Sequence, residues 1–379
     1  MADNKDKKVL KSSIERELSQ TCLNSAEREK IKGSTNLNVP HLRFPEFRGE
    51  WDIYEIGDVL CIGNGRDYKH LSKGDIPVFG TGGYMTSVNE CLHEGETTFI
   101  GRKGTINKPF YYNGKFWTVD TLFYTHSFKY VIPKFVYCLF QTINWLRYNE
   151  ASGVPSLSKD TIEKIKVRIP QLDEQKKIAK FLSLLDERIA TQNKIIEKLQ
   201  SLIKGIAHRV AGMGKPNVCL KECLECTSST LQESEVSDLG PYPVYGANGI
   251  VGFLDSYNTP DEAIYIVKDG SGVGSVVYVK GKCSATGTLN ILTAKQNYSL
   301  HFLYYLLKVF NYSPYKTGMA IPHIYFKDYG KSKIFCPPYA EQLQYAQLLV
   351  AIDTKLLAEK KILISFNSQK QYLLRELFI

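Results

Sequence analysis

One stretch of the 379-residue chain restricts its fold more than any other. Within residues 171–210, apolar side chains recur at alternating steps of four and three, and Gln192 alone interrupts the series. This heptad pattern is typical of a helix that buries one stripe of side chains against another helix. The stripe consists of Ile178, Leu182, Leu185, Ile189, Ile196, Leu199, Ile203, Ile206 and Val210.

The chain supplies a matching helix 167 residues later. There Glu359 takes the place of Gln192, and Lys370 takes the place of Ile203. Two ordinary amphipathic helices are the alternative, but the shared polar interruption favours a mutual pair. The second stripe consists of Tyr345, Leu349, Ile352, Leu356, Leu363, Phe366, Leu373 and Leu377.

The repeat extends beyond the helices. Residues 74–83 match 240–249, Pro155 matches Pro322, Pro170 matches Pro337, and Glu174-Gln175 matches Glu341-Gln342. A repeat of about 167 residues is too long for a solenoid, so it indicates a duplicated domain with its helix. The first copy mixes β-type runs with glycine turns, which predicts an α+β domain. Its expected strands are 97–100, 110–112, 116–119 and 164–169, and its expected helix is 136–148.

These boundaries divide the chain into five parts. We expect an N-terminal arm (1–42), a first domain (43–170), a first spacer helix (171–212), a second domain (213–337) and a second spacer helix (338–379). The fold class is then two similar α/β domains separated by a long antiparallel two-helix coiled coil, with an internal pseudo-two-fold repeat. The 33 residues from Ile178 to Val210 would form a rod of about 50 Å. Two similar domains at opposite ends of such a rod suit two separated half-sites on duplex DNA.

Charge and cysteine content narrow the class of protein. Lys and Arg outnumber Asp and Glu by 48 to 39, and the resulting net charge of +9 suits a polyanionic partner. No apolar run reaches the roughly 20 residues of a membrane span, and residues 1–5 lack a signal-peptide core. Nine scattered cysteines indicate reduced thiols. We therefore expect a cytoplasmic location.

Three fragments resemble catalytic or cofactor-binding motifs, but each lacks a residue that the motif requires. Residues 336–339 (Cys-Pro-Pro-Tyr) approach an amino-methyltransferase signature, yet a cysteine accepts the required hydrogen bond poorly. Cys219, Cys223 and Cys226 have the spacing of iron–sulfur ligands but lack a clear fourth ligand. The glycine-rich segments 80–83 and 270–274 lack the Gly-Lys-Ser/Thr ending of a phosphate loop, so turns are expected. The sequence predicts no catalytic residue and no metal site.

Basic and aromatic residues alternate in residues 101–119, where four basic residues stand without an acid. The corresponding part of the second domain carries three lysines against Asp269. A glycine-hinged loop of this kind can place Lys on phosphates and Arg on guanine edges, although a solvated turn with core aromatics explains any single residue equally well. With basic residues of comparable loops, the candidate DNA-binding set is Arg66, Lys69, Arg102, Lys103, Lys108, Lys115, Lys159, Lys268, Lys280, Lys282, Lys316, His323 and Lys327.

Over residues 42–379 the chain resembles the DNA-specificity (S) subunits of type I restriction–modification systems. The segments that carry the resemblance are 42–51 (Leu-Arg-Phe-Pro-Glu-Phe-Arg-Gly-Glu-Trp), 156–162 (Ser-Leu-Ser-Lys-Asp-Thr-Ile), 169–178 (Ile-Pro-Gln-Leu-Asp-Glu-Gln-Lys-Lys-Ile) and 181–186 (Phe-Leu-Ser-Leu-Leu-Asp). The second half departs from the pattern at Tyr339-Ala340 and Lys370, which leaves room for a more specialised second docking surface.

The resemblance implies two target-recognition domains, each reading one half of a bipartite, asymmetric DNA site. It also implies that the helical spacer docks two modification (methyltransferase) subunits, which in turn recruit restriction subunits. No cofactor is implied for this chain; S-adenosylmethionine, ATP and Mg are implied for the partner subunits. The alternatives are a self-contained DNA adenine methyltransferase or nuclease, and a twin-domain adaptor that does not bind DNA.

Overall fold

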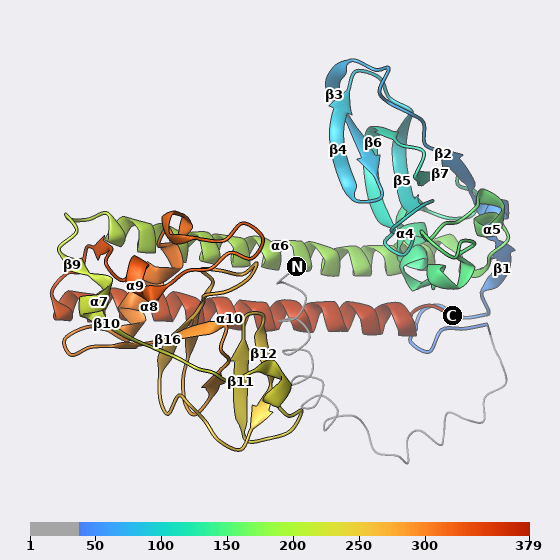
Figure 1. The fold of residues 1–379 in the computed structure, drawn as a ribbon. Helices are drawn as coiled ribbons and strands as arrows, with labels where there is room; N and C mark the ends of the chain where they lie inside the picture. The colour runs from blue at the N-terminus through green and yellow to red at the C-terminus, as the bar shows by residue number, and fades with distance from the viewer. Residues whose placement is uncertain (1–37) are drawn as a thin grey trace, which may run out of the picture. The chain divides into compact units, whose positions relative to one another are not determined.

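The computed structural model describes residues 38–379, so most of the expected N-terminal arm (1–42) lies outside the described residues. The described chain forms two compact units. The first unit comprises residues 38–193 and Lys361–Ile379, and the second comprises Lys194–Lys360. Each unit contains one α+β domain and part of each of two long helices, α6 (Leu172–Ala211) and α10 (Tyr339–Glu376) (Figure 1).

The first domain is built on a six-stranded sheet with the strand order β2-β7-β5-β6-β3-β4. All neighbouring strands are antiparallel except β3 and β6. The strands are β2 (Cys61–Asn64), β3 (Lys73–Gly80), β4 (Gly83–Val88), β5 (His93–Gly101), β6 (Phe110–Thr118) and β7 (Leu122–His126). A separate pair, β1 (Asp52–Glu55) and β8 (Lys166–Ile169), leads into α6. The helices are α3 (Ile56–Val59), α4 (Pro133–Thr142), the 3-10 turn η1 (Trp145–Tyr148) and α5 (Lys159–Glu163).

Three of the expected elements in this domain have other boundaries in the structure. The separate strands expected at 110–112 and 116–119 form one strand, β6, because Gly114 (φ +141°) lets the backbone bend opposite Gly95 (φ +132°) without interrupting the pairing. The helix expected at 136–148 ends at Thr142, since Ile143 is extended (φ −72°, ψ 129°) and a 3-10 turn follows. The last strand begins at Lys166 rather than 164.

The second domain repeats this order. One sheet has the order β10-β16-β13-β14, and a smaller sheet has the order β12-β11-β15. Gly281 (φ +84°), the repeat partner of Gly114, interrupts the strand here, so β14 and β15 together replace β6. The elements are β9 (Val218–Cys219), α7 (Leu220–Cys223), β10 (Leu224–Ser228), η2 (Glu233–Glu235), β11 (Tyr242–Gly246), β12 (Gly249–Leu254), β13 (Ala263–Val267), β14 (Val276–Val279), β15 (Ser284–Ala285), β16 (Leu289–Ala294), α8 (Leu300–Val309), η3 (Ser313–Tyr315), α9 (Phe326–Tyr329) and β17 (Lys333–Ile334).

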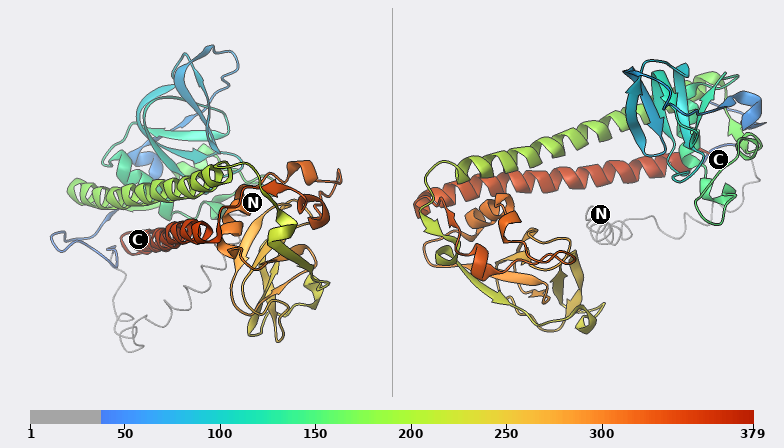
Figure 2. Two further views of the ribbon diagram at one scale, coloured as in Figure 1. Left: turned by 90° about the vertical axis from the view of Figure 1, so that its left-hand side faces the viewer. Right: turned by 45° about the horizontal axis from the view of Figure 1, so that its top comes forward.

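Within each unit α6 and α10 lie side by side and run antiparallel (Figure 2). In the first unit Leu182 is fully buried and packs in the same core as Leu373 and Leu377. In the second unit Val210 shares a core with Ala346 and Tyr345. The residues predicted to form the seam between the two helices are all buried or half-buried: Ile178, Leu182, Leu185, Ile189, Ile196, Leu199, Tyr345, Leu349, Ile352, Leu356, Leu363 and Phe366.

Lys370, the departure from the heptad pattern, is also buried in the first unit. Its ammonium lies 2.5 Å from a carboxylate oxygen of Asp186 and 5.7 Å from the ring centroid of Tyr137. The lysine is thus tolerated in the seam because an anion from the facing helix neutralises it. No helix among the described residues is both long enough and apolar enough to cross a lipid bilayer.

Candidate DNA interface

A loop that follows β5 is held in place by backbone hydrogen bonds on two sides. The amide of Arg102 donates to the carbonyl of Thr121 (2.8 Å), and the amide of Gly104 donates to the carbonyl of Pro155 (2.8 Å). The carbonyl of Arg102 in turn accepts from the amide of Leu157 (2.9 Å). The β5–β6 loop is therefore fastened between residues 119–121 and the loop that contains Pro155.

The second domain has the same set of backbone hydrogen bonds around its equivalent loop, and we call this arrangement the loop frame. The amide of Lys268 donates to the carbonyl of Thr288 (3.0 Å), and the amide of Gly270 donates to the carbonyl of Pro322 (3.0 Å). The carbonyl of Lys268 accepts from the amide of Ile324 (2.9 Å). Each of these residues is the repeat partner of its counterpart in the first domain. The backbone frame is thus duplicated, whereas the side chains that it carries differ.

In the first domain the frame brings several predicted residues together. Arg102, Lys103 and Lys159 line one surface hollow of about 380 Å³, which also includes Asn64 and Glu150. Hydrogen bonds from Thr161 and Ser158 keep the pKa of Glu150 below its usual value, so the carboxylate stays ionised beside the cations. The hollow remains rich in positive charge, as a phosphate-binding surface requires.

Two more predicted residues belong to the segment next to this hollow. The amide of Arg66 donates to the carbonyl of Thr118 (2.8 Å), and its carbonyl accepts from the indole nitrogen of Trp117 (2.9 Å). Lys69 is exposed in the same segment. The β3–β4 turn also approaches the frame, since a Cβ on Gly104 would lie 3.9 Å from the hydroxyl of Thr81.

Lys115 does not belong with Arg102, which corrects the expectation of one basic loop over residues 101–119. Lys115 lies in β6 opposite Glu94, at the far end of the β5–β6 pair, and its ammonium is 3.9 Å from that carboxylate. The loop itself ends before β6 begins at Phe110, so Lys108 is in the loop and Lys115 is outside it. Phe116 and Trp117 are core residues with 0% and 6% exposure and do not flank a binding loop.

The predicted residues of the second domain also separate into two places. Lys268 follows β13 directly, whereas Lys280 and Lys282 lie beyond the other end of the β13–β14 pair. The ammonium of Lys282 lies 4.9 Å from the ring centroid of Tyr257, so this cation is already engaged by an aromatic face. The expectation that Lys268, Lys280 and Lys282 share one loop is therefore wrong.

Two of the remaining predicted residues of the second domain, His323 and Lys316, lie in segments linked to the loop that follows Lys268. His323 forms backbone bridges with Asp269 and with Thr317, the residue after Lys316. The imidazole Nδ1 of His323 lies 2.9 Å from a carboxylate oxygen of Asp269. Lys327 lies on α9 and is 5.2 Å from the ring centroid of Tyr325. Whether these side chains contact DNA stays a prediction.

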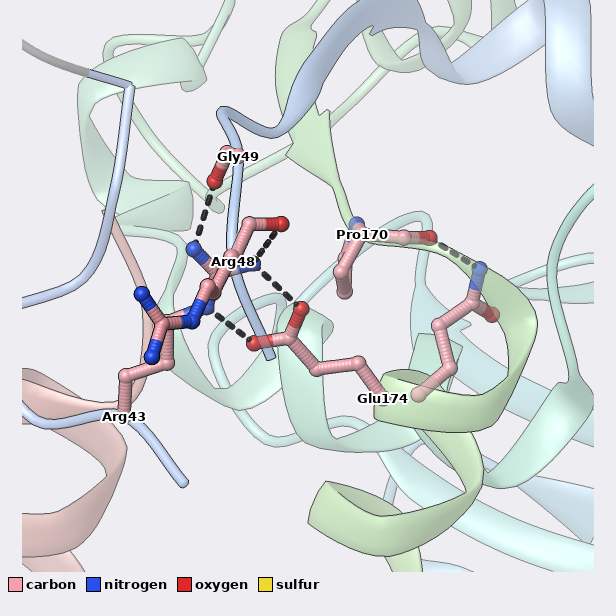
Figure 3. A network of polar contacts seen from close by, with 6 residues as sticks. Arg43, Arg48, Gly49, Pro170 and Glu174 are labelled. Atoms are coloured by element: carbon pink, nitrogen blue, oxygen red, sulfur yellow. Dashed lines mark hydrogen bonds and ion pairs between the residues drawn. The ribbon is translucent and has the colours of Figure 1, made fainter. Parts of the chain in front are cut away.

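The sequence did not single out a buried ion pair that fastens the segment before the first domain to α6. The guanidinium of Arg43 donates through Nε and Nη2 to the two carboxylate oxygens of Glu174, each at 2.8 Å (Figure 3). It also donates to the carbonyls of Arg48 (3.3 Å) and Gly49 (2.5 Å). Arg43 and Glu174 lie in segments 42–51 and 169–178, on which the family resemblance rests. The sequence therefore did mark both residues, although it did not show that they form a pair.

A glutamine next to this ion pair fastens each domain to the start of its helix. Gln175 donates to the carbonyls of Pro170 and Tyr130, each at 2.8 Å, and accepts from the amide of Ile132 (3.0 Å). Its repeat partner Gln342 donates to the carbonyl of Pro337 (2.9 Å) and accepts from the amide of Ser299 (2.9 Å). The repeated proline and Glu-Gln pattern therefore has a structural role.

The fragments that suggested chemistry have structural environments. Residues 337–338 lie between β17 and α10, as expected for prolines that end a strand and precede a helix. Cys223 is buried, and Cys219 and Cys226 are half-buried. Across residues 38–379 there is no group of three or more His, Cys, Asp or Glu side chains placed to hold a metal ion. Residues 80–83 form the β3–β4 turn.

The fold defines a class: a duplicated protein in which each unit combines one α+β domain with part of each of two long helices. A family model of the type I restriction modification DNA specificity domain matches residues 48–201 and again residues 215–365. The chain therefore belongs to the type I restriction–modification DNA specificity family. It is a specificity subunit with two target-recognition domains.

Individual relatives agree with this assignment. A putative type I restriction enzyme specificity subunit of Haemophilus influenzae is 22% identical over 333 residues, which span 79% of this chain and 86% of that protein. The specificity subunit of the type I enzyme MjaVIII of Methanocaldococcus jannaschii is 33% identical over 201 residues, or 46% of this chain and 44% of that protein. The crystal structure of a type I S subunit from M. genitalium has the same fold, with a TM-score of 0.67 at 18% identity, covering 90% of this chain and 99% of that one.

Proposed function

We propose that each target-recognition domain reads one half of a bipartite, asymmetric DNA site through its loop frame. The observation that carries this proposal is the duplicated frame, in which identical backbone hydrogen bonds hold different side chains. A rigid loop with exchangeable side chains is a sound basis for recognition, because phosphate contacts position the protein and base contacts specify the sequence. Because the two domains differ, the two half-sites differ.

The test is a domain exchange in the complete complex. Residues 43–170 are replaced by the same domain of another family member, and adenine methylation is mapped in cells that also express the partner subunits. We expect one half of the two-part motif to change and the other half to stay. A change in both halves would overturn the assignment of one domain to each half-site.

We also propose that the paired helices dock modification subunits. On the first unit, Phe181 and Leu184 are 41% and 50% exposed although both belong to α6. Leu184 and Phe366 border a hollow of about 470 Å³ that also includes Arg188. An exposed apolar surface with a charged rim is typical of a protein–protein contact.

Assembly of the complex tests this surface. Leu184→Glu should weaken binding of the modification subunit at least tenfold in a pull-down titration, because a charge would be buried in the contact. Leu146→Glu is the matched control, since Leu146 is a comparably exposed leucine (54%) on η1 that does not border this hollow. Equal effects of the two substitutions would argue against docking at this hollow.

We infer that the chain itself is non-catalytic and acts in the cytoplasm. The eight cysteines of the described residues are free thiols, which suits a reducing compartment. S-adenosylmethionine, ATP and Mg would then be bound by the modification and restriction subunits. Methyl transfer to DNA by the isolated chain would contradict this and would favour a self-contained methyltransferase. A lack of salt-dependent binding to duplex DNA would favour an adaptor.

A further inference from the structure

The two loop frames present one pair of side chains at equivalent positions. In the first domain, Lys103 and Ser156 form a backbone bridge between the loop after β5 and the loop that contains Pro155, which we call the proline loop. The proline loop of the second domain contains Pro322. In the second domain, the bridge joins Asp269 and His323. These four residues are repeat partners, so the same backbone site carries a cation and a hydroxyl in one domain and a carboxylate and an imidazole in the other.

The pair in the second domain is ordered and accessible. The carboxylate of Asp269 and Nδ1 of His323 lie 2.9 Å apart, and each side chain keeps 35% of its surface exposed. The imidazole thus restricts the orientation of the carboxylate, while both groups can still contact a ligand. A positioned polar group of this kind costs less side-chain entropy on binding than a free one.

The charge of Asp269 restricts what that ligand can be. Lys268 is its immediate neighbour, and Lys316 and Lys327 stand on the adjoining segments. Those lysines would attract phosphates, whereas a surface carboxylate repels them. An acid at the centre of a basic frame is compatible with DNA only where it faces a hydrogen-bond donor, and the amino groups of bases are such donors.

The proline loops add a second feature that the two domains share. Val154 (67% exposed) and its repeat partner Ile321 (58% exposed) each stand immediately before the proline of the frame. Exposed aliphatic side chains at this place can contact the methyl group of thymine in the major groove. Both loops therefore combine one polar and one apolar side chain in the manner of a groove-facing surface.

We propose that the bridged pairs are the base-reading elements of the two domains, an inference that rests on the proposed function. Lys103 donates to the O6 and N7 acceptors of a guanine in the first half-site. Asp269, oriented by His323, accepts from the N4 amino group of a cytosine in the second half-site. The difference between the pairs makes the recognised site asymmetric at these positions.

Asp269→Asn in the complete complex tests the second pair. The amide side chain favours adenine, so one position in the second half of the methylated motif should change from cytosine toward adenine. In duplex competition, discrimination at that position should fall on the order of 10- to 100-fold. Asp255→Asn is the matched control, because Asp255 is an exposed aspartate that follows the last residue of β12. The other end of β12 forms the β11–β12 turn, and that turn is the part of the hairpin that approaches the loop frame, near Gly272. Asp255→Asn should leave the motif unchanged.

A graft provides an independent test in the first domain. Lys103→Asp together with Ser156→His transfers the second pair onto the first frame, and a guanine in the first half-site should give way to cytosine. Folded variants that methylate the unaltered motif would overturn the inference. If the exchange of residues 43–170 changes one half-site while these variants change nothing, only the inference fails. If the exchange itself has no effect, the proposed function fails first.

Discussion

The guanidinium of Arg43 donates to both carboxylate oxygens of Glu174, whose side chain is only 2% exposed. A buried carboxylate is tolerated when a cation and hydrogen bonds compensate its lost hydration. This ion pair joins the segment before β1 to the first turn of α6, across 131 residues of sequence. Single residues can therefore control how the first domain is attached to its helix.

Arg43→Ala should lower the free energy of unfolding of the first unit by about 3–5 kcal/mol, because it leaves the Glu174 carboxylate buried without a partner. Urea unfolding of the whole chain measures the loss. Arg48→Ala is the control, since the Arg48 side chain is exposed and only its backbone carbonyl takes part in the network. A loss below about 1 kcal/mol for Arg43→Ala would mean that the ion pair is effectively solvated.

A comparison of Arg102 with Lys115 tests which part of the first domain contacts DNA. Arg102→Ala should weaken binding to duplex DNA and reduce the slope of log affinity against log salt by about one. Lys115→Ala should leave both quantities unchanged, because Lys115 lies at the opposite end of the β5–β6 pair. Equal slopes for the two variants would remove the loop after β5 from the interface.

At the scale of secondary-structure elements, β5 and β7 bring two histidines together. The ring centroids of His93 and His126 are 5.6 Å apart, and both rings contact Tyr124. Burial lowers the pKa of His93. Burial also lowers the pKa of His126, with His93 and Lys159 adding to the effect. The strands therefore hold both imidazoles in an environment that favours the neutral form.

Stability of the first unit should consequently depend on pH. With folded-state pKa values below 6.5, the unfolded chain binds protons more readily as the pH falls through 6.5. The stabilising contribution is present above that pH and is lost as the pH falls toward the folded-state values. Urea midpoints between about pH 7.5 and pH 5.5 should fall, and His93→Gln with His126→Gln should flatten the dependence. His41→Gln, at an exposed histidine, should leave the slope unaltered.

At the scale of the whole molecule, α6 is a single helix from Leu172 to Ala211. A helix rises about 1.5 Å per residue, so one added heptad lengthens it by about 10 Å without rotating its apolar stripe far from the seam. If the helices set the distance between the two half-sites that the domains read, that distance should depend on helix length.

Seven residues inserted after Asn193 and seven inserted after Lys360 should lengthen the nonspecific spacer of the DNA motif by about three base pairs, at about 3.4 Å per base pair. Methylation mapping measures the spacer, and both half-sites should keep their sequences. Replacing seven residues at the same places without changing the length is the control. An unaltered spacer in a folded, active complex would show that the helices do not set the distance.

The sequence by itself determined the helical pair, the duplication and the family. Heptad spacing is a local pattern, and a 167-residue repeat is a comparison of the chain with itself, so neither needs a third dimension. The interruption at Lys370 was visible too, but its neutralisation by Asp186, 184 residues away, was not.

Only the tertiary structure decided which polar residues act together. Lys115 stands 13 residues from Arg102 in sequence, yet strand register places it at the other end of the β5–β6 pair. Pro155 and Gly104 are far apart in sequence, yet one hydrogen bond joins the two loops that contain them. The physical reason is that strand pairing and loop hydrogen bonds join distant residues, and a linear pattern carries no record of which residues they join.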